Sequence, residues 1–122
     1  MTLSQIHSVL AQSMILYSLA YGLWGLYNYV RKVGPSGSYW GTLMVAELLY
    51  IAQGVAGAVL YLQGLRPARG VHLLYGVLAL ITVPAAYAYL RGQDDRRVSL
   101  VFGLVGLFLA GVALRAIGTA GP

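Results

Sequence analysis

The chain has 122 residues, of which 59% are hydrophobic and 9% are charged. A soluble domain carries about 25% charged residues, so this chain could not cover itself with a polar surface and is expected to lie in a membrane. Its formal net charge of +5 comes from basic residues between the apolar runs, where it indicates membrane topology and gives no reason to expect nucleic acid. The absence of cysteine excludes disulfides, zinc–cysteine sites and thiol catalysis.

Four long apolar runs follow one another along the chain. About 20 apolar residues span the hydrocarbon core as a helix, and short connections make neighbouring helices antiparallel. The predicted spans are residues 4–30, 38–64, 70–90 and 98–118. We therefore expect an all-α membrane protein, with four transmembrane helices in an up-down antiparallel bundle that forms a single domain. The first run is expected to be retained, because it lacks the basic segment that begins a signal peptide.

The first predicted helix has a histidine near its start, His7, and the third has the other histidine of the chain, His72. Alternate helices of such a bundle run parallel and lie on a diagonal, so both rings are expected at the same depth on the same side. Adjacent axes lie about 8–10 Å apart, which lets two inward-facing imidazoles on diagonal helices hold a haem iron between them. The alternative is two interfacial histidines that bond water or lipid.

The second predicted helix carries the only acidic residue in any span, Glu47, and a glutamine near mid-membrane, Gln53. Ionisable residues within a membrane are functional candidates by default. At 1.5 Å per residue, Glu47 lies about 27 Å from the side of the histidines. The plain interpretation is an ion pair with Arg31, Lys32 or Arg91, and the alternative is a role with protons or quinone. Gln53 is expected to bridge helices or contact a ligand.

Small residues recur at helical spacing, and in lipid they let helices approach closely. The plain interpretation is tight packing within the bundle. The sharper one is that some glycines make room for a flat macrocycle, with Gly57 and Gly76 as candidates to line it. In the fourth helix, Gly103, Gly106 and Ala110 are expected to form a contact face for another chain. Pro84 is expected to kink the third helix, because it removes one backbone hydrogen bond.

Aromatic and basic residues indicate where the helices leave the membrane. An aromatic belt is predicted near the first and third loops, from Tyr27, Tyr29, Tyr39, Trp40, Tyr87 and Tyr89. The side of these loops carries five basic residues, Arg31, Lys32, Arg91, Arg96 and Arg97. The histidine side carries three, Arg66, Arg69 and Arg115, so the positive-inside rule favours both termini outside. These three arginines could bind haem propionates or extend to lipid headgroups.

Three segments carry a recognisable pattern: Gln53-Gly54-Val55-Ala56-Gly57-Ala58, Gly64-Leu65-Arg66-Pro67 and Val71-His72-Leu73-Leu74. Together they resemble one helix–loop–helix of the heme A synthase family, in which such a loop leads to a ligand histidine and an earlier helix begins with its partner. The resemblance covers about residues 5–80, roughly half of such a synthase, and implies that His7 and His72 are axial ligands. The family's substrate half has a glutamate where this chain has Ser4, so the likeness is to the half that holds haem b.

These patterns predict a haem b-binding membrane protein of cytochrome b type, with bis-histidine ligation that favours electron transfer over oxygen chemistry. We expect it to be an electron-transfer protein or subunit rather than a self-contained enzyme. It is expected in the plasma membrane, in contact with lipid, as a homo-oligomer or within a larger redox complex.

Two alternatives stay open. One is a small proton-coupled transporter that acts around Glu47. The other is a non-catalytic structural subunit of a respiratory or photosynthetic complex, where the histidines could ligate the magnesium of a chlorophyll-type pigment or hold no cofactor.

Overall fold

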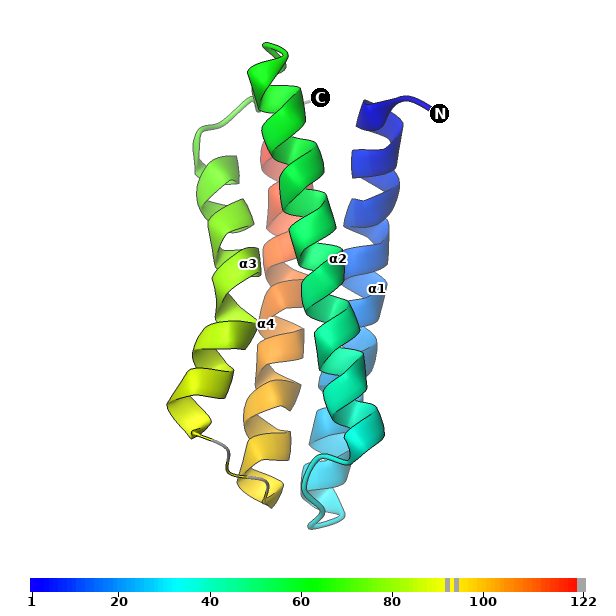
Figure 1. Ribbon diagram of the computed structural model, residues 1–122, viewed down its shortest axis with the longest axis vertical. Helices are drawn as coiled ribbons and strands as arrows, with labels where there is room; N and C mark the ends of the chain where they lie inside the picture. The colour runs from blue at the N-terminus through cyan, green and yellow to red at the C-terminus, as the bar shows by residue number, and fades with distance from the viewer. Residues whose placement is uncertain (92, 94, 121–122) are drawn as a thin grey trace.

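The chain folds into four helices that lie side by side in alternating directions (Figure 1). The computed structural model describes residues 1–91, 93 and 95–120. The helices are α1 (Leu3–Val30), α2 (Gly37–Leu62), α3 (Val71–Leu90) and α4 (Arg96–Ala120). Each is long and apolar enough to cross a membrane, so the protein is a multi-pass membrane protein. The predicted all-α antiparallel bundle is confirmed, and the four helices begin and end within two residues of the predicted spans.

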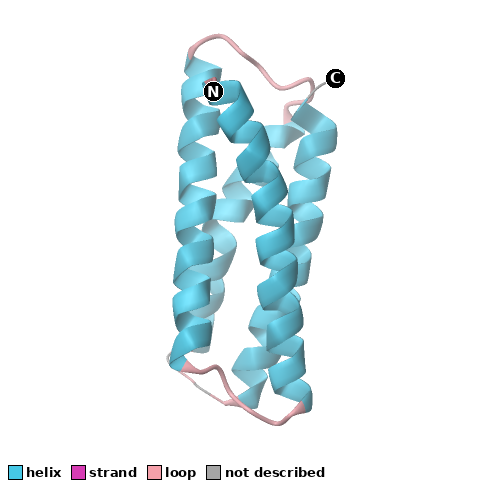
Figure 2. Cartoon of the chain, turned by 90° about the vertical axis from the view of Figure 1, so that its right-hand side faces the viewer, coloured by secondary structure: helices cyan, strands magenta, loops and turns pink. Residues whose placement is uncertain are grey.

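Both histidines lie near one end of the bundle. The loops lie at its two ends and leave the sides of the helices uncovered (Figure 2). Met1 and Ala120 lie at the end where α1 begins, which we call the histidine end because α1 and α3 start there with His7 and His72. Of the predicted third loop, Gly92 and Asp94 lie outside the described residues.

Local sequence defines where the first two helices begin. Thr2 and Gln5 form a capping box, in which each side chain accepts a hydrogen bond from the other residue's backbone N–H. The Ser36 hydroxyl oxygen likewise accepts from the Tyr39 N–H at the start of α2. Such caps satisfy N–H groups that the first turn of a helix leaves free. In α1 the cap fixes His7 in the second turn.

Around the bundle, α1 and α3 each pack against α2 and α4 and so face one another across a diagonal, as predicted. The contact between α1 and α4 is the most extensive, and the contact between α2 and α3 is the least. Pro84 lies inside α3, where it can donate no backbone hydrogen bond. Toward its C-terminal end α3 leans away from α2 (Figure 1), and residues of both helices line a cavity there.

The contact between α1 and α4 is built from glycines that let the two backbones touch. A Cβ atom on Gly106 would lie 2.5 Å from the Cα of Gly22, and one on Gly25 would lie 2.8 Å from the Cα of Gly103. The interpretation of small residues as tight packing within the bundle is confirmed here. The prediction that Gly103, Gly106 and Ala110 form a contact face for another chain is wrong, because all three are buried inside this chain.

Buried tyrosines form a polar network in the middle of the bundle. The Tyr50 hydroxyl hydrogen-bonds with the hydroxyls of Ser18 and Tyr21, and all three side chains are buried. The Tyr39 hydroxyl donates to the Tyr21 carbonyl oxygen at 2.7 Å. Because lipid offers no partners, polar groups inside a membrane must be satisfied by the protein. Tyr39 is fully buried, so its assignment to the aromatic belt is wrong.

Candidate functional site

The structure brings the two histidines together inside one end of the bundle. His7 lies on α1 and His72 on α3, and both side chains are partly buried. Their ring centroids are 6.4 Å apart, and the ring planes meet at 71°. A metal ion bound at about 2 Å from one nitrogen of each ring holds two imidazole centroids about 6 Å apart. The spacing therefore suits one shared metal ion, and the predicted equal depth of the two residues is confirmed.

The His72 ring is held by the last turns of α4. Its Nδ1 lies 2.8 Å from the carbonyl oxygen of Ala116 and 3.3 Å from the hydroxyl of Thr119. The carbonyl can only accept, so the proton of a neutral ring lies on Nδ1, and Nε2 keeps its lone pair. Metal-ligating histidines are held in this way, with one ring nitrogen donating to a carbonyl and the other free to bind.

The His7 ring packs against α2, where glycine makes room for it. A Cβ atom on Gly57 would lie 3.1 Å from Cε1 of His7. From the same helix, the Gln53 amide donates to the His7 carbonyl oxygen at 2.8 Å. Nδ1 of His7 and Oε1 of Gln53 are buried, and neither has a hydrogen-bond partner among the described residues. The two contacting residues thus carry a potential donor and a potential acceptor that are both unused.

The arginines lie at the histidine end but do not contact either ring. Arg66 stacks on the Tyr61 ring, 3.6 Å from its centroid, and donates to the Tyr61 carbonyl oxygen. Arg69 is exposed, and its backbone N–H donates to the carbonyl oxygen of Thr119, which ties this loop to the end of α4. Arg115 is exposed beside a groove between α3 and α4. Their role with propionates stays a prediction.

Gly76 is a further predicted site residue that does not join the histidine pair. It is exposed on α3, and a Cβ atom added to it would meet nothing within 4 Å. The four residues that do meet are His7, His72, Gly57 and Gln53. The two rings come from diagonal helices, and α2 and α4 hold one ring each. All four helices therefore take part in this end of the bundle.

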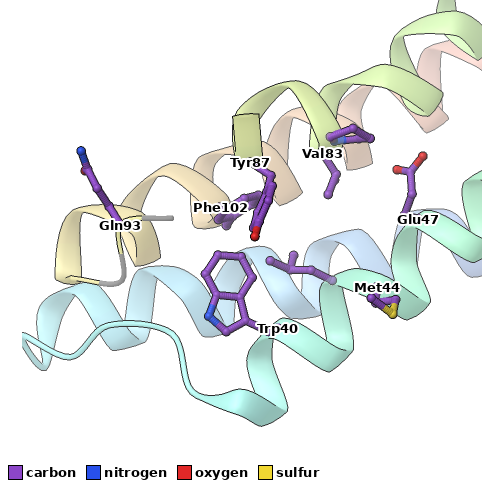
Figure 3. A pocket seen from close by; sticks show the side chains of 9 residues that line it. Trp40, Met44, Glu47, Val83, Tyr87, Gln93 and Phe102 are labelled. Atoms are coloured by element: carbon purple, nitrogen blue, oxygen red, sulfur yellow. The ribbon is translucent and has the colours of Figure 1, made fainter. Parts of the chain in front are cut away.

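Glu47 lies in a separate cavity of about 590 Å³ between α2 and α3 (Figure 3). The expected ion pair with Arg31, Lys32 or Arg91 is not formed, because Oε1 of Glu47 is buried and has no partner among the described residues. The neighbouring Trp40, for which the sequence predicts only an aromatic belt, lines this cavity. A signal was present, since Trp40, Met44 and Glu47 recur at the spacing that places residues on one face of a helix.

The donor set limits which metal centre this end of the bundle could hold. Within the described part of the chain, no three histidine, aspartate or glutamate side chains gather at one place. Two imidazoles alone leave most coordination positions of a free metal ion unfilled. The iron of a haem is already bound by the four nitrogens of the macrocycle and needs only axial ligands from the protein.

The chain matches no protein-family model, no curated protein and no solved structure.

Proposed function

We propose that the protein binds one haem b between His7 and His72 and transfers electrons within the membrane. The observation that carries this proposal is the 6.4 Å spacing of the two rings across the bundle. It is supported by the hydrogen bond from His72 Nδ1 to the Ala116 carbonyl oxygen, which leaves Nε2 available as a ligand. The resemblance to the haem-b-binding half of heme A synthases agrees with the same two ligands.

The residues of the chain have distinct roles in this proposal. His7 and His72 would supply the protein ligands of the iron, and the Ala116 carbonyl oxygen fixes the orientation of the His72 ring. Gly57 gives the His7 ring its place against α2. A bound haem would supply one-electron redox chemistry, and ligation by two histidines would leave its iron no open position for oxygen. Electron transfer is therefore favoured over binding of oxygen.

The surroundings of the histidine end support the same assignment. Arg66, Arg69 and Arg115 lie at that end, where they could pair with the propionates of a haem. We further propose that the protein lies in the plasma membrane with both termini outside, because the opposite end carries five basic residues against three here. A redox partner, or a second copy of the chain, would exchange electrons with the bound haem.

An absorbance spectrum of the purified protein in detergent tests the proposal. We expect a Soret band, and an α-band that sharpens on reduction with dithionite. His7→Ala and His72→Ala should each remove the low-spin spectrum, because each removes one axial ligand. A wild-type protein that is colourless, and that stays so when haem b is added, would overturn the proposal. A chlorin spectrum would show that the bound cofactor is a magnesium pigment and not haem.

Two controls separate loss of a ligand from loss of the fold. Added imidazole should restore the low-spin spectrum of His72→Ala, because it can fill the space that the substitution leaves. His72→Met should keep a low-spin haem and raise its reduction potential, since methionine is a weaker donor to the iron. If His72→Ala keeps an unchanged low-spin spectrum without imidazole, His72 is not a ligand.

A further inference from the structure

A second site lies in the cavity between α2 and α3, about 15 Å along α2 from the glycine that contacts His7. Its lining is apolar and aromatic except for one carboxylate and one amide. The lining includes Trp40, Met44 and Glu47 of α2, Tyr87 of α3 and Phe102 of α4. Figure 3 shows Glu47 directed from α2 into the space beside α3. The cavity is separate from the histidine pair.

The Glu47 carboxyl group has no partner that would explain its position. It lies within a membrane-spanning helix, and one of its oxygens is buried without a hydrogen bond from any described residue. A carboxylate in an apolar environment is costly unless a positive charge or a hydrogen-bond donor accompanies it. Among the described residues, no basic side chain lines this cavity. A cationic ligand would supply the missing charge.

The aromatic side chains add a second reason to expect a cation. The Trp40 ring lies edge-on to the rings of Tyr87 and Phe102, with centroids 5.7 Å and 5.5 Å apart. Aromatic faces attract organic cations, and tryptophan does so most strongly. Glu47 and these rings belong to the same cavity, so a charge held by the carboxylate would lie within an aromatic wall.

The lining also distinguishes an organic cation from a metal ion. Calcium takes six to eight oxygen ligands, and magnesium about six. Among the described lining residues, Glu47 supplies the only carboxylate. Most of the remaining surface is apolar and suits the hydrocarbon body of a ligand. The cavity lies between α2 and α3, the neighbouring helices with the least extensive contact, and the exposed Met44 and Tyr87 line the side on which it would open toward lipid.

We propose that this cavity binds a lipophilic organic cation, with the Glu47 carboxylate at its positive centre and Trp40 and Tyr87 against its apolar body. Such a ligand partitions into the bilayer and reaches the cavity from the side, between α2 and α3. The site does not depend on haem, so the proposal stands or falls independently of the proposed function.

Binding of tetraphenylphosphonium tests this assignment. Equilibrium dialysis of the purified protein in detergent should show saturable binding at one site per chain. Glu47→Gln keeps the size of the side chain and removes its charge, so we expect affinity to fall by about tenfold or more. Triphenylmethane, a neutral molecule with similar rings, should compete poorly. Absence of saturable binding to the wild-type protein would overturn the proposal.

A matched pair of tyrosines on α3 provides a control that does not touch the charge. Tyr87 lines the cavity and Tyr89 does not, although both are exposed. Tyr87→Leu should weaken binding about threefold, and Tyr89→Leu should leave it unchanged. If Glu47→Gln binds tetraphenylphosphonium as tightly as the wild type, or if triphenylmethane competes as well as a cationic ligand does, the cavity does not recognise charge and the proposal is wrong. Should Glu47→Gln not fold, equal effects of the two tyrosine substitutions would decide against the site.

Discussion

Three buried polar atoms lack a hydrogen-bond partner among the described residues, and they belong to His7, Gln53 and Glu47. Native structures leave few such groups, and each one calls for an explanation. Two of these atoms lie at the proposed haem site, and the third lies in the proposed cation site. Elsewhere, buried hydroxyls such as those of Ser18 and Tyr50 are paired. At the scale of single residues, unused hydrogen-bonding capacity therefore coincides with the two candidate sites.

The Tyr50 hydroxyl should contribute to stability, because it joins two other buried hydroxyls. Tyr50→Phe would leave the Ser18 and Tyr21 hydroxyls without this partner, at a cost of about 1–2 kcal/mol. Tyr89→Phe changes an exposed hydroxyl and should stay within about 0.5 kcal/mol of wild type. Denaturation in mixed micelles, followed by circular dichroism, measures both. Equal stability of the two variants would remove the stabilising role of the network.

Gln53 is a positioning residue for the proposed haem ligand on α1. Its amide donates to the His7 carbonyl oxygen, and its own oxygen is buried without a hydrogen-bond partner among the described residues, as is Nδ1 of His7. We expect Gln53→Ala to weaken haem binding by about tenfold and to shift the reduction potential, as loss of outer partners of metal ligands does. Gln63→Ala, at the exposed end of α2, is the matched control. An unchanged potential in Gln53→Ala would assign Gln53 to packing alone.

At the scale of helices, the sequence predicted where each begins and ends but not which faces meet. Long uncharged runs determine a membrane helix, because charge is excluded from hydrocarbon. The faces by which the helices meet were harder to predict, since exposed and buried residues are equally apolar in this chain. Leu23, for example, is exposed, and Leu43 is buried. Gly106 was therefore assigned to another chain, although its partner is Gly22 of the same chain.

Candidate sites were predictable to the extent that they depend on rare residue types. His7 and His72 are the only histidines, so depth and helix order were enough to pair them. The hydrogen bond that holds His72 could not be predicted, because a carbonyl oxygen such as that of Ala116 leaves no mark in the sequence. The pairing of Glu47 was wrong for a different reason. The local direction of its side chain, into a cavity beside α3, is set by tertiary packing.

The contact between α1 and α4 yields a prediction at this scale. Gly106→Ala would place its Cβ atom 2.5 Å from the Gly22 backbone, so the helices must separate, at a cost of about 1–3 kcal/mol. Gly111→Ala, on the same helix, meets nothing within 4 Å and should leave stability unchanged or raise it by up to about 1 kcal/mol. Thermal unfolding in detergent compares the two. A Gly106→Ala protein as stable as Gly111→Ala would contradict this packing.

At the scale of the whole molecule, the proposed orientation can be tested cleanly, because the chain has no cysteine of its own. Ala68→Cys places a thiol in the exposed loop at the histidine end, and Gln93→Cys places one at the opposite end. A membrane-impermeant maleimide added to intact cells should label Ala68→Cys, whereas Gln93→Cys should react only after permeabilisation. The reverse pattern would place both termini in the cytoplasm.

The glycine contact between the first and last helices also has a consequence for biogenesis. Arg96 at the start of α4 bonds the Tyr29 carbonyl oxygen of α1, 67 residues earlier in the chain. Contacts between distant parts of a chain form late, because the intervening segments must be ordered first. A ribosome that has released only α1, α2 and α3 therefore leaves the Gly22–Gly25 surface facing lipid. Assembly of the bundle then awaits membrane insertion of the last helix, and a prematurely terminated chain would expose this surface to quality-control proteases.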